Sequence, residues 1–138
     1  RRFFGISSGM DEKTILVGCC ETPVTEAIKV LLKGGHHIIE RTRMDEFVNE
    51  ASTGRFDSVV LCPNSISPPL LVDGGLLENA VAAVKAIKGA RAVPLVVLST
   101  MPSWRDPLLA AGADAFLSLP LNVTEFREAV GGCLHHRG

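Results

Sequence analysis

The feature that most constrains the fold of this chain is a fivefold alternation of short apolar runs with longer amphipathic segments. The apolar runs have the length of strands covered on both faces, and the amphipathic segments carry apolar residues at helical spacing. Alternating units of this kind form a parallel sheet with helices on both faces and right-handed crossovers. We therefore predict an α/β domain of (βα)5 type, a doubly wound, five-stranded parallel sheet in the order 2-1-3-4-5.

The elements can be placed along the chain. Predicted strands cover residues 15–17, 37–41, 58–62, 94–99 and 115–119, and predicted helices cover 23–32, 44–51, 77–87, 103–111 and a last segment from 122. The segment 63–75 holds three prolines and is predicted to be a loop. Predicted helix N-caps are Thr22, Thr42, Ser103 and Asn122. In the last helix the spacing predicts four inward residues, which are Val123, Phe126, Ala129 and Val130.

Composition excludes several classes of protein. Apolar residues make up 46% of the chain and charged residues 21%, a balance typical of one globular domain with its own core. The net charge of −1 gives no overall field that would favour nucleic acid or a membrane surface. The four cysteines are too few and too irregularly spaced for a secreted disulfide scaffold, and no secretory signal is found, so we expect a cytoplasmic protein. Residues 1–9 are interpreted as a leader or linker, and residues 10–138 as the domain.

In a doubly wound sheet the ligand site lies outside the carboxyl ends of the strands, near the point where the strand order reverses. Two adjacent cysteines, Cys19 and Cys20, follow the first predicted strand, and Cys62 closes the third. The fourth strand ends at Ser99, and the fifth leads through Leu119 to a proline. These are the candidate site residues.

Four segments resemble the signature segments of bacterial response-regulator receiver domains. They are ILVGCCETP, FDSVVLCPN, VPLVVLST and AGADAFLSLPLNVTEF, in that order and at matching spacing across residues 13–136. The Ala-Gly-Ala-Asp run before the last strand, with an X-Pro step after it, is the most specific piece. The resemblance implies a flavodoxin-like fold and a role in two-component signal transduction.

The resemblance also implies a chemistry, from which this sequence departs. Receiver domains transfer a phosphoryl group to their own aspartate with Mg²⁺, which prefers oxygen ligands. The family's acidic pair falls on Cys19 and Cys20, its phospho-acceptor on Cys62, and its lysine on Leu119. Ser99, at the hydroxyl position, and Glu21, after the acidic pair, keep compatible chemistry.

These departures predict a pseudo-receiver, a receiver-like domain that does not accept phosphate on aspartate. Thiols are poor Mg²⁺ ligands, so we expect no metal, no cofactor, no catalytic residue and no enzyme activity. The expected partner is another signalling protein or domain, or a second copy of the chain, with no nucleic acid and no membrane. The resemblance places that contact on the face of the fourth helix, fifth strand and fifth helix, with Ser99, Trp104 and Phe116 as switch or partner-face residues.

The thiols leave alternatives open. If Cys19, Cys20 and Cys62 share one pocket, they could form a redox sensor, through a disulfide of Cys62 with Cys19 or Cys20, or bind a soft metal. They could equally be small apolar residues filling a neutralised pocket. A cysteine-dependent phosphotransfer enzyme is a third alternative, although the glycine and arginine of a phosphate-cradling loop are missing. Packing roles are predicted for Cys133, and structural roles for the pairs His36-His37 and His135-His136.

Overall fold

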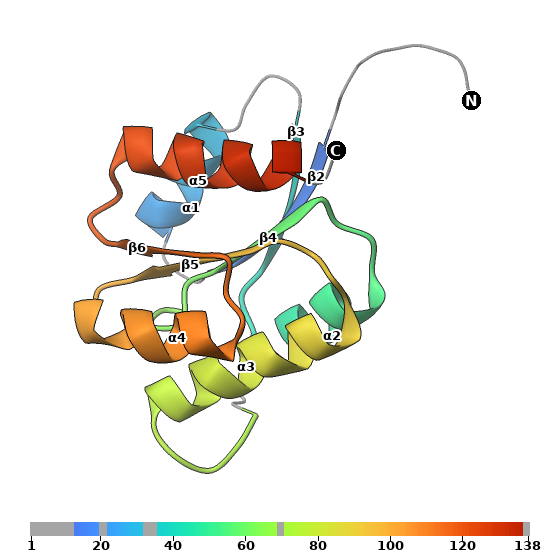
Figure 1. Ribbon diagram of the computed structural model, residues 1–138, viewed down its shortest axis with the longest axis vertical. Coiled ribbons are helices and arrows are strands. Elements are labelled where there is room, and N and C mark those ends of the chain that lie inside the picture. Colours follow the sequence, from blue (N-terminus) through green and yellow to red (C-terminus); the bar gives the residue numbers. More distant parts are fainter. Residues whose placement is uncertain (1–12, 20–21, 32–35, 69–70, 137–138) are drawn as a thin grey trace.

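The computed structural model describes residues 13–19, 22–31, 36–68 and 71–136, and it contains one five-stranded parallel sheet (Figure 1). The strands run in the order β3-β2-β4-β5-β6, which is the predicted order 2-1-3-4-5. Their bounds are β2 (Lys13–Gly18), β3 (His36–Arg41), β4 (Ser58–Leu61), β5 (Leu95–Ser99) and β6 (Ala115–Ser118). The predicted fold class is therefore confirmed.

Helices cover both faces of the sheet. Their bounds are α1 (Thr22–Leu31), α2 (Met44–Thr53), α3 (Leu76–Ala90), α4 (Arg105–Ala111) and α5 (Val123–His136), with a 3-10 turn, η1 (Pro102–Trp104), before α4. In Figure 1, α1 and α5 lie on one side of the sheet and α2, α3 and α4 lie on the other. This three-layer arrangement is the one expected when each strand is followed by a crossover helix.

The core consists of two apolar layers separated by the sheet. Successive side chains of a strand point to opposite faces, so each strand contributes to both layers. Leu16 belongs to the layer beneath α2, α3 and α4, together with the fully buried Phe47, whereas Ile15 and Val17 belong to the layer that contains Phe126 of α5. Burial on both faces explains why the strands read as continuous apolar runs.

The prediction that Thr42 caps α2 is wrong. The backbone stays extended through Arg43, because Arg43 forms an isolated parallel bridge with Ser67. The Ser67 amide donates to the carbonyl of Thr42 at 2.7 Å, and the Met44 amide donates to the carbonyl of Ser67 at 2.8 Å. Arg43 is therefore the N-cap residue, and no side chain caps the helix there.

Ser103 does not cap α4 either. It lies inside η1, a turn in which the amide of Trp104 donates to the carbonyl of Met101 at 3.0 Å. The α-helix then begins at Arg105, one residue later than a cap at Ser103 implied. The short turn was missed because a 3-10 turn and the first turn of an α-helix share the same local sequence preferences.

The last helix agrees with the prediction except at its first residue. Asn122 Oδ1 accepts the amide of Glu125 at 2.9 Å, which confirms the predicted cap. Phe126 and Val130 are buried as predicted. Val123 is 47% exposed, so its inward assignment is wrong.

The predicted loop between β4 and α3 is organised around one buried amide side chain. Asn79 is fully buried, and its Oδ1 accepts the amides of Leu71 at 2.6 Å and Val72 at 2.9 Å. Its Nδ2 donates to the carbonyls of Val72 and Gly75, both at 3.0 Å. All of these bonds join α3 to the described end of the loop, so Asn79 holds this segment against the helix.

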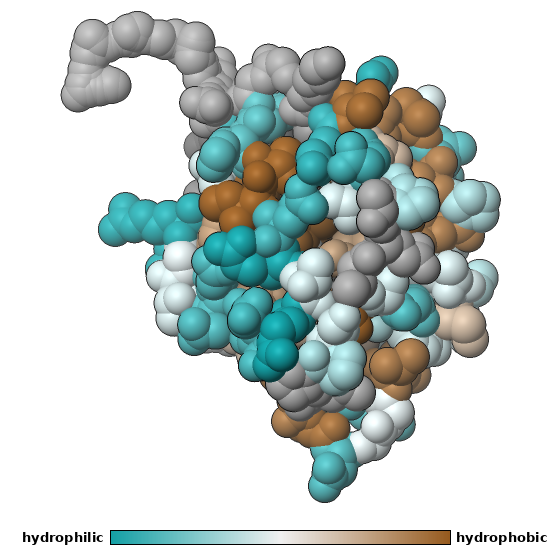
Figure 2. Space-filling model, turned by 180° about the vertical axis from the view of Figure 1, so that it is seen from behind, coloured by the Kyte–Doolittle hydropathy of each residue, from teal (hydrophilic) through white to brown (hydrophobic). Residues whose placement is uncertain are grey.

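The outer surface is mainly hydrophilic on the side seen from behind, where apolar side chains gather in separate patches (Figure 2). In the described ranges, every helix is too short or too polar to cross a bilayer.

Candidate functional site

The carboxyl ends of the strands bring four of the predicted site residues to one edge of the sheet. The amide of Cys62 donates to the carbonyl of Gly18 at 2.9 Å, which places the exit of β4 beside the exit of β2. The amide of Leu119 donates to the carbonyl of Ser99 at 2.8 Å, which places the exit of β6 beside that of β5. Cys19, Cys62, Ser99 and Leu119 therefore share this edge. The predicted site residues Cys20 and Glu21 lie outside the described residues.

The two described thiols at this edge belong to the apolar core. Cys19 is 2% exposed and Cys62 is 1% exposed, and both are members of the layer that contains Val17 and Val60. Leu119 is partly buried and packs against the same layer. An ionised group buried in such surroundings would need a charged partner or several hydrogen bonds. The edge is thus packed with apolar side chains at these three positions.

A residue that the sequence reasoning missed, Ser65, also contacts this edge. The Cys19 Sγ lies 3.4 Å from the Ser65 Oγ. Ser65 is held there by a turn in which its own amide and that of Ile66 both donate to the carbonyl of Cys62 at 3.1 Å. The run from Pro63 to Ser65 is rich in turn-forming residues, which is the only sequence signal that pointed to such a turn.

The structure describes two of the three thiols of the predicted cluster, Cys19 and Cys62. No disulfide links Cys19 to Cys62, and Cys20 is not described. Within the described ranges, no three side chains of His, Cys, Asp or Glu lie close enough together to hold a metal ion.

The hydroxyl of Ser99 connects two loops of this edge. Ser99 is fully buried, and its Oγ donates to the Asn64 Oδ1 at 2.5 Å while accepting the amide of Met101 at 3.0 Å. The Asn64 Oδ1 also accepts the amide of Thr100 at 3.3 Å. The turn after β4 and the turn after β5 are therefore fixed to each other by side-chain hydrogen bonds.

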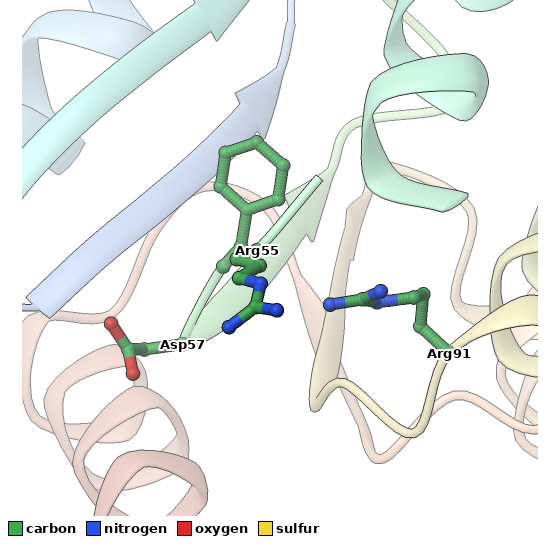
Figure 3. A pocket seen from close by; sticks show the side chains of 4 residues that line it. Arg55, Asp57 and Arg91 are labelled. Carbon is green, nitrogen blue, oxygen red and sulfur yellow. The ribbon is translucent and has the colours of Figure 1, made fainter. Parts of the chain in front are cut away.

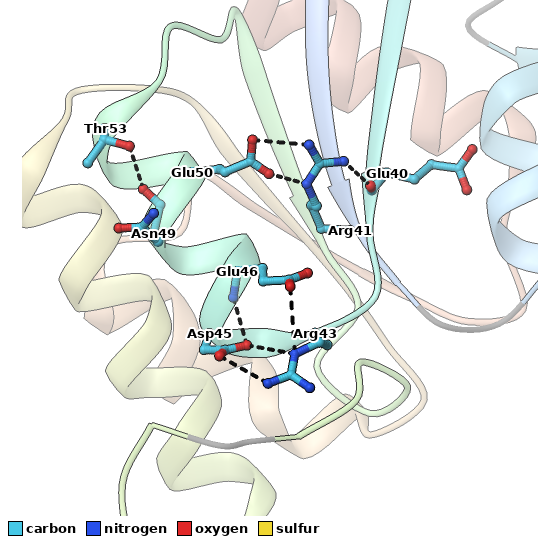
Figure 4. A network of polar contacts seen from close by, with 8 residues as sticks. All are labelled: Glu40, Arg41, Arg43, Asp45, Glu46, Asn49, Glu50 and Thr53. Carbon is cyan, nitrogen blue, oxygen red and sulfur yellow. Dashed lines mark hydrogen bonds and ion pairs between the residues drawn. The ribbon is translucent and has the colours of Figure 1, made fainter.

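The end of β3 is fastened to α2 by an ion pair (Figure 4). The Arg41 guanidinium donates to both carboxylate oxygens of Glu50, through Nε and through Nη2. Its Nη1 donates to the carbonyl of Glu40 at 2.6 Å, and the carbonyl of Arg41 accepts the amide of Cys19 at 3.1 Å. Through this last bond the ion pair helps to place the backbone of Cys19 at the edge.

A second ion pair lies at the start of α2, also drawn in Figure 4. The Arg43 guanidinium donates to both carboxylate oxygens of Asp45, at 3.3 and 3.2 Å, and lies 3.8 Å from the carboxylate of Glu46. The hydrogen bond from Arg43 lowers the pKa of Asp45, and the same bond raises the pKa of Arg43. Both side chains are exposed, so the pair contributes little to the stability of the fold.

Two of the predicted partner-face residues lie between the core and the surface. Trp104 and Phe116 are both partly buried and pack against the core layer beneath α2, α3 and α4. Two exposed apolar side chains precede or begin the helices on either side of β6: Met101, before η1, is 42% exposed, and Val123, the first residue of α5, is 47% exposed. The strand β6 forms the end of the sheet on this side, and none of its residues is fully buried.

Comparison of the sequence with protein-family models and with curated proteins finds no match.

Solved structures do match the whole domain. The receiver domain of the Francisella response regulator 1452 superposes with a TM-score of 0.73 at 18% identity, covering 91% of this chain and 99% of that one. The receiver domain of the Pseudomonas aeruginosa sensor histidine kinase PA1611, which has a magnesium ion in its active-site cleft, gives 0.72 at 18% identity over 90% and 98%. A two-component response regulator from Clostridium difficile gives 0.73 at 19% identity over 91% and 98%. The chain therefore has the fold of the receiver domains of two-component signalling proteins.

Proposed function

We propose that this domain is a non-catalytic signalling module of the two-component type that acts without phosphorylation of an aspartate. The observation that carries the proposal is the packing of Cys19, Cys62 and Leu119 into one apolar layer. By resemblance to receiver domains, these are positions of one carboxylate of the acidic pair, of the phospho-acceptor and of the lysine.

The chemistry of the described edge supports this proposal. Mg²⁺ is a hard cation that takes carboxylate, carbonyl and water oxygens, and phosphoryl transfer needs positive charge around the transferred group. The described side chains that meet at the ends of β2, β4, β5 and β6 are two buried thiols, two hydroxyls, one amide and a leucine, all of them uncharged. The charged pair at the end of β3, Arg41 and Glu50, is bonded to itself. The uncharged set provides neither an attacking carboxylate nor a cation to neutralise the phosphoryl oxygens.

The hydrogen bonds of Ser99 give a second line of support. In receiver domains a hydroxyl at this position moves together with an aromatic at the Phe116 position when the domain is phosphorylated. Here the hydroxyl is already bonded to Asn64 and to the amide of Met101. A ligand shifts a two-state equilibrium only through a difference in affinity for the two states. We infer that the domain keeps one arrangement of this loop in the absence of any phosphoryl group.

The binding partner is proposed to be another signalling protein or domain, or a second copy of the chain, held at the face of α4, β6 and α5. This face includes β6, the edge strand of the described sheet, and two exposed apolar side chains lie close to it in sequence, Met101 before η1 and Val123 at the start of α5. Edge strands and exposed apolar groups are the features that most readily make protein contacts.

The phosphorylation claim is tested with acetyl phosphate and Mg²⁺, followed by intact mass measurement under conditions that preserve acyl phosphates. We expect no phosphoryl adduct on the wild-type domain. The variants Cys62→Ser and Ser99→Ala serve to map any adduct that forms. An adduct lost in either variant, or found on an aspartate by peptide mapping, would overturn the proposal.

The partner face is tested by sedimentation velocity across a range of concentrations. If a second copy binds there, Val123→Glu weakens self-association, whereas Val30→Glu, a matched change of an exposed valine on α1, leaves it unchanged. A monomer at every concentration excludes the second copy and leaves another protein as the partner. Self-association that is weakened equally by both changes contradicts the assigned face.

The alternative of a thiol sensor receives no support from the structural neighbours, which are signalling receiver domains. Burial raises the cost of forming a thiolate and lowers reactivity, and Cys19 and Cys62 are both buried. Counting reactive thiols before and after mild oxidation tests this alternative. Loss of two thiols per chain, accompanied by a changed fold, would favour the sensor over the proposed module.

A further inference from the structure

A second feature lies at the opposite edge of the sheet, where the strands begin. A hollow of about 280 Å³ is lined by Arg55, Phe56, Asp57 and Arg91. Arg55 follows the end of α2, and Arg91 is the residue that ends α3, so the two arginines come from different loops. Figure 3 shows the guanidinium of Arg91 pointing across the hollow toward that of Arg55, while the carboxylate of Asp57 points away from both.

The one carboxylate that lines the hollow, that of Asp57, is bonded to another segment. The Asp57 Oδ2 accepts the amide of Thr14 at 2.8 Å. In the described part of the chain, no carboxylate lies within ion-pair distance of Arg55 or Arg91, although five other basic side chains each have one. These five are Lys29, Arg41, Arg43, Lys88 and Arg105. Lys13, Lys85 and Arg127 also have no ion pair within the described ranges, but Arg55 and Arg91 differ from them in lining one hollow together, where both can contact the same anion.

A simpler explanation accounts for only part of this arrangement. Both α2 and α3 end at this edge, and the partial negative charge of a helix C-terminus favours a nearby cation. That effect explains one arginine at each helix end. It gives no reason for the two guanidiniums to line the same hollow, since like charges facing each other repel. An anion between them would remove this repulsion.

The hollow adjoins a second one whose lining is partly polar and partly apolar. A second hollow of about 350 Å³ is lined by Phe56, Ala90, Arg91, Ala92 and Val93, so it shares Phe56 and Arg91 with the first. A ligand that filled both would therefore carry its anionic group between the arginines and an apolar body against Phe56 and Val93.

We propose that this edge binds a phosphate monoester with an apolar or aromatic body, its phosphate held between Arg55 and Arg91. A single guanidinium fork satisfies a carboxylate through two parallel bonds, whereas a tetrahedral phosphate offers separate oxygens to two forks. A free small molecule and a phosphorylated side chain of another protein present this same chemistry. The site lies at the opposite edge from Cys62 and Ser99 and is independent of the function proposed above.

The test is an NMR titration of the ¹⁵N-labelled domain at constant ionic strength, monitored through the signals of the backbone amides and of the arginine Nε–H groups. The probes are phenyl phosphate, inorganic phosphate, benzoate and a phosphoserine peptide. We expect phenyl phosphate to shift the signals of Arg55 and Arg91 and to bind more tightly than inorganic phosphate or benzoate. Each of Arg55→Gln and Arg91→Gln should weaken its binding about tenfold, the loss typical of charged hydrogen bonds.

The matched control is Arg105→Gln, which removes an arginine that is exposed on α4 and paired with Asp106. Its affinity for phenyl phosphate should equal that of the wild type. If the phosphoserine peptide binds more tightly than phenyl phosphate, the ligand is a phosphorylated protein partner. If phenyl phosphate binds more tightly than the peptide, the ligand is a free small molecule. The proposal is overturned if no phosphate probe shifts these arginines, if benzoate binds as tightly as phenyl phosphate, or if the arginine variants lose thermal stability but no affinity.

Discussion

Replacing Gly18 by alanine would test how tightly the backbone that carries Cys19 is packed. Gly18 is the last residue of β2 and is paired in register with Arg41 on one side and Leu61 on the other. A Cβ at this position would lie 2.5 Å from the Cδ1 of Phe47, 2.7 Å from its Cγ and 2.8 Å from its Cε1. These separations are far shorter than a normal carbon–carbon contact of about 3.5–4.0 Å.

The expected cost follows from the surroundings of Phe47. Its ring is fully buried, so it cannot retreat toward solvent, and Gly18 is fixed by ladder bonds on both sides. Overpacking a core of this kind costs about 1–3 kcal/mol, and the contact of a new methyl with several ring atoms places Gly18→Ala near the upper limit. For a domain of this size that corresponds to a drop in Tm of about 10 °C.

The measurement is chemical denaturation followed by circular dichroism. Gly89→Ala is the matched control, because Gly89 lies in α3 and its added Cβ would meet no atom within 4 Å. That change should stabilise the helix by about 0.5–1 kcal/mol. In the double variant Gly18→Ala/Phe47→Leu, the smaller side chain should recover about 1 kcal/mol or more relative to additivity. An unchanged stability for Gly18→Ala, or a fully additive double variant, would refute the reasoning.

Three further predictions concern other described residues. Asn79→Ala should destabilise the domain by about 2–4 kcal/mol, since four backbone groups lose their hydrogen-bond partner, and it should expose the segment before α3 to limited proteolysis. The control is Asn122→Ala, which removes one exposed helix cap and should lower the unfolding free energy by only about 1 kcal/mol in the same denaturation assay. Ser58→Ala should leave the unfolding free energy unchanged or raise it by up to about 1 kcal/mol, because the Ser58 Oγ is buried without a hydrogen-bond partner among the described residues. Arg43 lowers the pKa of Asp45, so the pair stabilises the fold above the unfolded pKa of about 3.9 and loses this effect as the pH falls through the folded pKa. Asp45→Asn should therefore lower Tm slightly at pH 7, and the difference from the wild type should shrink as the pH is lowered below about 3.9.

The fold class could be predicted from the sequence because its signals were regular. Each buried strand is a continuous apolar run, and each crossover helix has apolar residues at helical spacing, which together indicate a doubly wound parallel sheet. The strand order was predicted as the one that five-stranded sheets of this kind most often have. The same reasoning correctly placed Cys19, Cys62, Ser99 and Leu119 at one edge, because the carboxyl ends of parallel strands meet there.

Features that depend on contacts between distant loops could not be read from the sequence. Nothing in the local sequence distinguishes Asn79 from a solvent-facing helix residue, although it is fully buried. The cap at Thr42 failed because a bridge to Ser67 keeps the chain extended for one more residue. Arg55 and Arg91 are separated by a strand and a helix, so their common hollow emerges only from the packing of two loops.

The starts of β4 and β6 are each held by the same reciprocal pair of hydrogen bonds from an aspartate to the neighbouring strand. The amide of Asp57 donates to the carbonyl of Thr14, and the Oδ2 of Asp57 accepts the amide of Thr14. Asp114 makes the equivalent two bonds with Leu95. A slip of one residue would turn every side chain of a strand to the wrong face of the sheet. These hydrogen-bond pairs therefore set the register of each strand with its neighbour. Homologous chains should therefore tolerate inserted residues ahead of either aspartate, and should exclude them between the aspartate and the strand that follows it.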